Sequence, residues 1–143
     1  MLDAHADPLE SDLRRAVSTA YYAIFHCLAA NCADLFIGES DSPRSHAAWR
    51  QVYRGLDHKD AKSACARPET SHFPEPIRHF ARQFAAMQEM RHKADYSPDA
   101  VYYKSNVAIL IDEAQKAIEE FVSAPATDRR AFAAWVLFKL RKA

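Results

Sequence analysis

Apolar residues recur every three or four positions along most of this chain, the spacing that places side chains on one face of an α-helix. The chain contains only 2 glycines among 143 residues. Alanine, leucine, arginine, glutamate and glutamine, which favour helices, are common instead. No stretch alternates apolar and polar residues as a strand would. The sequence therefore predicts an all-α fold.

Proline, glycine and N-capping residues divide this pattern into five helical segments. The expected segments are residues 9–37, 45–56, 76–94, 97–123 and 127–142. Ser45, Ser97 and Thr127 are the predicted N-caps, and Gly38 the predicted stop of the first helix. Residues 57–76 contain three prolines and are expected to be mostly loop, with a helical turn at 61–66 at most.

Short connections between these segments predict an antiparallel up-and-down bundle of four to five helices. The length fits one domain over residues 1–143. Its core would span residues 9–123, followed by a basic amphipathic helix over residues 127–142 that docks on the bundle or on a partner.

The charge balance and the cysteine content limit the classes of protein to which this chain could belong. The 19 basic and 19 acidic residues cancel, which removes the general electrostatic case for nucleic-acid binding but leaves room for a local basic groove. One locally basic set surrounds the third segment and is equally well explained as a solvated face or a binding surface: Arg78, His79, Arg82, Arg91, His92 and Lys93. Three cysteines without a CxxC pair fit a reduced compartment. With no signal peptide and no membrane-spanning apolar run identified, we expect a cytoplasmic protein.

Several kinds of site are disfavoured by spacing. The two glycines, Gly38 and Gly55, are too far apart to form a phosphate-binding loop. The seven histidines are scattered and none has the i, i+4 spacing of a helical zinc motif. Cys27 and Cys32 resemble packing residues rather than nucleophiles. We expect neither a metal nor a cofactor.

Arg91 lies whole heptads after Phe84 and Ile77, on the apolar face of its predicted helix. An arginine in that position needs an acceptor because its guanidinium does not lose its charge. Asp95, one turn later, is the expected partner. The pair is either a structural ion pair or half of a site.

A second, semi-polar stripe runs along the first helix through Arg15, Thr19, Tyr22 and His26. In one interpretation Tyr22 and His26 pack at the boundary of the core. In the other they face Arg91 and Asp95 across a groove. The choice depends on how the helices pack.

Two motifs together resemble the HEPN superfamily. Residues 16–26 read Ala-Val-Ser-Thr-Ala-Tyr-Tyr-Ala-Ile-Phe-His, and residues 91–96 read Arg-His-Lys-Ala-Asp-Tyr. The resemblance covers residues 9–123 and implies a helical bundle that commonly forms homodimers. Many members accompany nucleotidyltransferase domains in prokaryotic toxin–antitoxin or defence systems, and several are metal-independent ribonucleases.

The nuclease members carry a histidine four to six residues after the arginine. Here those positions include Asp95 and Tyr96, so a general acid or base would come from His26, His92 or Tyr96. Arg67 and His72 match the spacing formally, but they lie in the proline-containing loop.

Three hypotheses follow. The first is a dimeric HEPN-type module that binds RNA, a nucleotide or a partner protein, such as a nucleotidyltransferase. Its binding groove consists of Tyr22, His26, Arg91, Asp95 and Tyr96. The second is a metal-independent ribonuclease with Arg91, His26 and His92 as catalytic residues. The third is a structural network that fixes helix register, in a protein that acts through its surface.

Overall fold

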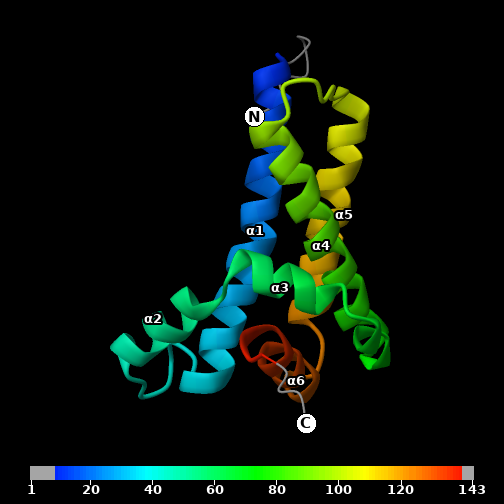
Figure 1. Cartoon of the computed structure of the whole chain (residues 1–143). Helices are drawn as coiled ribbons and strands as arrows, with labels where there is room; N and C mark the ends of the chain where they lie inside the picture. Colours follow the sequence, from blue (N-terminus) through cyan, green and yellow to red (C-terminus); the bar gives the residue numbers. More distant parts are fainter. Residues whose placement is uncertain (1–8, 140–143) are drawn as a thin grey trace.

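The computed structural model describes residues 9–139, and within that range the chain is all-helical, without strands (Figure 1). Its elements are α1 (Glu10–Ile37), α2 (His46–Gly55), α3 (His58–Cys65), a 3-10 helix η1 (Pro68–His72), α4 (Glu75–Tyr96), α5 (Lys104–Val122) and α6 (Ala126–Leu137). Residues 9–139 therefore contain six α-helices, one more than the largest number predicted. The additional helix is α3.

The three long helices α1, α4 and α5 lie against one another and enclose most of the core (Figure 1). The predicted apolar stripe of α4 is confirmed, because Ile77, Phe80, Phe84 and Met87 are all fully buried. Phe80 stacks on Phe121 of α5, with 4.1 Å between ring centroids. Residues that recur on one face of each helix thus meet in one shared core.

Helix α1 is long and apolar enough to cross a membrane by length and composition, contrary to the sequence-based expectation that no segment would be. A core helix of a water-soluble protein passes the same test. The buried side of α1 includes Val17, Tyr21, Ile24 and Leu28, each with no exposed surface. Packing against the other helices accounts for part of this apolarity, since 39% of the apolar 18-residue window of α1 is buried.

The predicted stop at Gly38 is confirmed. Gly38 has a φ of 127°, and its N–H donates to the carbonyl of Asp34 at 2.9 Å. The predicted N-cap at Ser45 is also confirmed, because its hydroxyl accepts a hydrogen bond from the N–H of Ala48 at 3.2 Å. Helix α2 is fastened to α1 through Trp49, whose Nε1 donates to Asp34 at 2.9 Å.

The expectation of a mostly irregular segment between residues 57 and 76 is wrong. Helix α3 begins after Asp57, whose carboxylate accepts from the N–H of Asp60 at 2.9 Å and so caps the helix. Ala61, Ala64 and Cys65 are buried against the rest of the protein. This helix buries small side chains, so the large apolar residues that usually reveal a helix are absent from its sequence.

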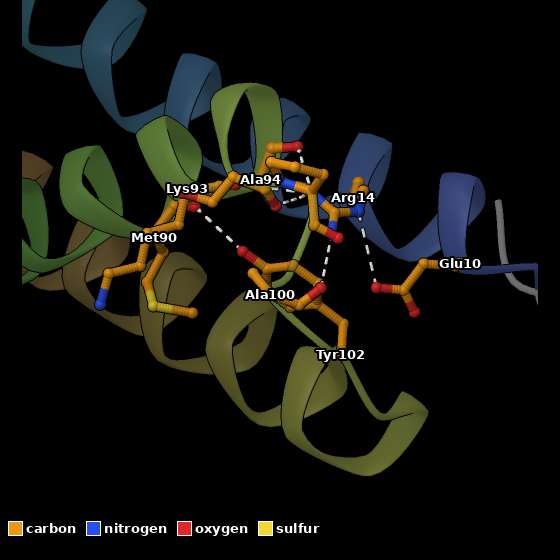
Figure 2. Close-up of polar contacts among 9 residues, drawn as sticks. Glu10, Arg14, Met90, Lys93, Ala94, Ala100 and Tyr102 are labelled. Atoms are coloured by element: carbon orange, nitrogen blue, oxygen red, sulfur yellow. Dashed lines mark hydrogen bonds and ion pairs between the residues drawn. The ribbon is translucent and has the colours of Figure 1, made fainter.

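The predicted helix start at Ser97 is also wrong. Helix α4 continues to Tyr96, residues 97–103 form a connection, and α5 begins at Lys104. The cause is Arg14 of α1, whose guanidinium donates to the carbonyls of Ala94, Ser97 and Ala100 (Figure 2). Because Arg14 satisfies these carbonyls, the connection is held without a helix of its own.

Helix α6 docks on the bundle, which confirms one of the two expected placements. Phe132, Ala133 and Val136 are buried, and Nε1 of Trp135 donates to the carbonyl of Ala64 at 2.9 Å. The predicted cap at Thr127 is wrong: the residue before the helix is Pro125, and no side chain caps it. Residues 140–142 of the predicted C-terminal helix lie outside the described residues.

Candidate functional site

Arg91 lies in the penultimate turn of α4 and reaches α1. Its Nη2 donates a hydrogen bond to the hydroxyl of Tyr22 at 2.7 Å, and its Nε lies 3.0 Å from Oδ2 of Asp95. The Arg91 side chain retains 19% of its exposure. The expected contact with Asp95 is therefore present. So is a contact with Tyr22, which only one of the two interpretations of the semi-polar stripe required.

The ion pair leaves part of the guanidinium unsatisfied. The Nε atom of Arg91 is buried and forms no hydrogen bond, because its N–H is not aimed at the nearby Asp95 carboxylate. The guanidinium also lies over the rings of Tyr21 and Tyr22, 5.7 and 5.3 Å from their centroids. Burial acts to lower the pKa of Arg91, but the contacts with Tyr22, and the charges of Asp95 and Tyr96, raise it overall. Arg91 is a permanent cation with spare donor capacity.

Helix α3 adds a histidine that the sequence-based reasoning missed. Nδ1 of His58 lies 2.5 Å from the hydroxyl of Tyr21, and its ring stacks on Phe25 with 3.9 Å between centroids. Its ring also meets Tyr22 edge-on at 6.1 Å. Burial lowers the pKa of His58, and the nearby charge of Arg91 lowers it further, which outweighs the opposite effect of Asp57. His58 is therefore neutral at pH 7 and able to accept a proton.

His26 pairs with a tyrosine of α2. Nδ1 of His26 lies 2.5 Å from the hydroxyl of Tyr53, and the His26 ring stacks between Tyr53 and Tyr22 at 5.9 and 6.0 Å. Tyr53 is partly buried, and this burial raises its pKa. His26 itself is exposed. Sequence-based reasoning missed Tyr53 as well as His58.

We call these side chains the Arg91 cluster: Tyr22, His26, Tyr53, His58, Arg91 and Asp95. The cluster joins α1, α2, α3 and α4. It combines one cation, two imidazoles, two phenol hydroxyls and one carboxylate, and the carboxylate contacts the cation. Donors and proton acceptors of this kind suit a phosphate group and its neighbouring hydroxyls.

Two predicted site residues lie beside the cluster. His92 and Tyr96 are both exposed, and their rings contact each other at a centroid distance of 4.9 Å. Neither forms a hydrogen bond with a member of the cluster among the described residues. Tyr96 nevertheless contributes to the electrostatic surroundings of Arg91.

Arg15 and Thr19, the remaining members of the semi-polar stripe, line a different feature. A groove of about 520 Å³ lies between α1 and α5. Its lining is mostly apolar: Asp12, Arg15, Ala16, Thr19, Ala20, Ala23, Ile111, Ala114, Gln115 and Ile118. The stripe thus divides, with Tyr22 and His26 in the cluster and Arg15 and Thr19 in the groove.

Within residues 9–139 we identify neither a metal centre nor a reactive cysteine. No three histidine, cysteine, aspartate or glutamate side chains in this range are grouped to hold a metal ion. Burial raises the pKa of Cys27 to about 11 and that of Cys32 to about 12. These thiols remain protonated near neutral pH and pack as apolar groups.

Comparisons with family models, curated proteins and solved structures found no match. The HEPN resemblance therefore remains a prediction based on the two motifs.

Proposed function

We propose that the chain is an HEPN-type module, with the family's antiparallel up-and-down bundle, that binds the phosphate of RNA or a nucleotide at the Arg91 cluster. The observation that supports this most directly is the spare donor capacity of Arg91. Its Nη2 donates to Tyr22 and its Nε lies beside Asp95, but its Nη1 forms no hydrogen bond within residues 9–139, and the side chain retains 19% of its exposure. A phosphate oxygen is a strong acceptor for such a donor.

The surroundings of Arg91 suit a nucleotide better than a bare anion. Tyr22 and His26 form a stacked pair beside the guanidinium, and the ring of Tyr96 is two-thirds exposed. Exposed aromatic and imidazole rings stack on bases without requiring a particular sequence. A local arrangement of this kind also explains how a chain with no net charge would bind RNA.

The proposal includes a homodimer formed through the groove between α1 and α5. Asp12 and Arg15 carry opposite charges on the same helix and line this groove. In a two-fold dimer each contact occurs twice, and we place the axis so that Asp12 of each copy meets Arg15 of the other. The His26 end of the Arg91 cluster lies farther along the same helix. In the family's setting the protein would be cytoplasmic, with a nucleotidyltransferase-type partner in a prokaryotic toxin–antitoxin or defence system.

A second candidate function is a metal-independent ribonuclease, which one observation favours. The motif histidine absent after Arg91 has a spatial counterpart in His58, a neutral imidazole that contacts Tyr22 and lies within the electrostatic influence of Arg91. In this mechanism an imidazole removes the proton of a ribose 2′-hydroxyl, and the 2′-oxygen attacks the adjacent phosphate. The bond from phosphorus to the 5′-oxygen of the next nucleotide breaks, that oxygen accepts a proton from a second group, and a 2′,3′-cyclic phosphate remains. Arg91 stabilises the charge that develops. His26 and His92 remain candidates for the second proton transfer.

The binding proposal is tested by titrating a fluorescent RNA oligomer at constant salt into the wild type and two variants. Arg91→Met removes the charge but retains most of the volume, and it is expected to weaken binding by about tenfold or more. Arg54→Gln removes an exposed arginine of α2 and serves as the matched control. Equal affinity of the wild type and Arg91→Met would refute the proposal. If the wild type binds no RNA or nucleotide and Arg91→Met mainly lowers the melting temperature, the structural alternative holds.

The ribonuclease candidate is tested by incubating labelled RNA with the protein in EDTA. Loss of cleavage in both Arg91→Met and His58→Asn supports it. Cleavage that survives Arg91→Met excludes this mechanism. Comparing His26→Asn with His92→Asn then identifies the second proton-transfer residue.

A further inference from the structure

Three arginines line a pocket near the start of α4, at the opposite end of this helix from Arg91. The pocket has a volume of about 270 Å³ and lies where α3, η1 and α4 meet. Its lining consists of Cys65, Arg67, Pro68, Thr70, Ser71, Arg78 and Arg82. No acidic side chain lines it within the described part of the chain. Three cations around one hollow repel one another unless an anion lies between them.

Arg67 is the least satisfied of the three. Its guanidinium lies over the ring of Trp135 at 5.1 Å, and its Nη1 is buried without a hydrogen-bond partner. Within residues 9–139, no carboxylate forms an ion pair with Arg67. Burying a guanidinium nitrogen without an acceptor is costly.

The other two arginines share one carboxylate. Glu75 accepts from Arg82 at 2.7 Å and pairs with Nη2 of Arg78 at 2.8 Å. The Nε of Arg78 is nevertheless buried without a partner. The three arginines and Glu75 together leave a net charge of two positive. Two of the three arginines that line this pocket thus each carry a buried nitrogen without a hydrogen-bond partner.

We propose that this pocket binds the phosphate group of a small phosphorylated molecule. A phosphate monoester carries about two negative charges at neutral pH, which matches the excess charge of the pocket. Its oxygens would accept from the guanidinium groups of Arg67 and Arg78, which line the pocket and each carry a nitrogen without a hydrogen-bond partner. Arg82, whose side chain is 58% exposed, lies at the mouth. The Ser71 hydroxyl, which has no partner in the described structure, is a further donor.

This pocket is distinct from the Arg91 cluster. Arg78 and Arg82 precede Arg91 by 13 and 9 positions in α4, which correspond to rotations of about 220° and 180° around a helix. The two sets of arginines therefore face different sides of α4, about 14 to 20 Å apart along its axis. One phosphate group does not reach both.

The test uses the Nε–Hε resonances of the arginine side chains in the ¹⁵N-labelled full chain. Inorganic phosphate is titrated at fixed ionic strength, with chloride as the reference anion, and the affinity is measured by calorimetry. We expect phosphate to shift the resonances of Arg67 and Arg78. Arg67→Met, which retains contact with Trp135, is expected to weaken this binding by about tenfold. Arg82→Gln changes an exposed side chain and is expected to weaken it less while leaving the fold intact.

Two controls separate this site from other anion binding. Arg50→Gln removes an exposed arginine of α2 and is expected to leave the phosphate affinity unchanged. Arg91→Met is expected to leave the Arg67 and Arg78 shifts unchanged, even if it abolishes RNA binding. The proposal is overturned if phosphate shifts neither Arg67 nor Arg78, or if Arg67→Met and Arg82→Gln both retain wild-type affinity.

The source of the phosphate is distinguished by competition. Adenosine 5′-monophosphate that displaces inorganic phosphate from Arg67 indicates a phosphorylated organic molecule, whereas failure to displace it indicates free phosphate. An RNA oligomer that competes more strongly than the mononucleotide would overturn the assignment to a small ligand.

Discussion

The hydroxyl of Tyr21 and Nδ1 of His58 lie 2.5 Å apart, so a fully buried side chain of α1 is joined to the short helix α3. Tyr21 remains a neutral phenol, since burial raises its pKa far above the physiological range. Protonation of His58 would place a charge among Tyr21, Phe25 and Arg91. The burial of His58 at this contact, together with the charge of Arg91, lowers its pKa and therefore makes the fold sensitive to acid.

Stability should fall as the pH is lowered through the range in which unfolded histidine titrates. The pKa of His58 is below its ordinary value of 6.5 in the folded state, so the unfolded state binds the proton more readily. The resulting stability is fully present above about pH 6.5 and is lost as the pH falls below it. Urea unfolding at about pH 7.5 and 5.5 measures this loss. His58→Asn should make this loss of stability smaller. Lys59→Gln, a change at the neighbouring exposed residue, should leave the loss unchanged.

Arg14→Ala should destabilise the protein by about 2–3 kcal/mol, because several backbone carbonyls at the end of α4 lose a charged donor. Arg14 donates to Ala94 and Ser97 at 2.9 Å each. Arg50→Ala, at an exposed position, is the control and should change stability by no more than about 0.5 kcal/mol. Chemical denaturation measures both. Similar stabilities of the two variants would show that water replaces Arg14 without cost.

Substitution of the two glycines by alanine should have opposite effects on the stability of the protein. At Gly38 a Cβ atom would lie 2.8 Å from Oγ of Ser42 on a backbone with a φ of 127°, so Gly38→Ala should cost about 1–3 kcal/mol. At Gly55, in α2, a Cβ atom would meet nothing within 4 Å. Gly55→Ala should stabilise by about 0.5–1 kcal/mol. Thermal unfolding of the pair tests both signs, and destabilisation by Gly55→Ala would contradict the helical assignment of that residue.

The proposed dimer predicts that Ala23→Arg reduces self-association. Ala23 is exposed and lines the groove between α1 and α5, where a large charged side chain would clash with a second copy. Ala47→Arg introduces the same side chain at an exposed site on α2 and is the control. Sedimentation velocity over a range of concentrations measures the association. An unchanged dimer in Ala23→Arg would place the interface elsewhere, and a monomeric wild type would exclude the dimer.

The long helices were predictable because each buries large side chains at helical spacing. The stripe through Phe80 and Phe84, and the pairing of Arg91 with Asp95, follow from positions along one helix. Helix α3 was not predictable from that pattern, because it buries alanine and cysteine side chains. Its one local signal is the capping carboxylate of Asp57.

The errors around residue 97 have a different origin. Ser97-Pro98-Asp99 has the local chemistry of a helix start, but Arg14 binds the surrounding carbonyls from more than 80 positions away. The sequence shows which residues are able to cap a helix, and tertiary packing decides which of them do. The proximity of His58 and Tyr53 to the motif residues likewise depends on how α2 and α3 fold back against α1.

Arg14 has a consequence for the geometry of the Arg91 cluster. Arg14 and Tyr22 lie eight residues apart on α1, or about 12 Å along its axis, and both contact the last turns of α4. These two contacts are separated along α1, and together they restrict the rotation of α4 about its own axis. We therefore expect a substitution at Arg14 to loosen the end of α4 and so to change the direction of the Arg91 guanidinium, although no hydrogen bond joins the two arginines.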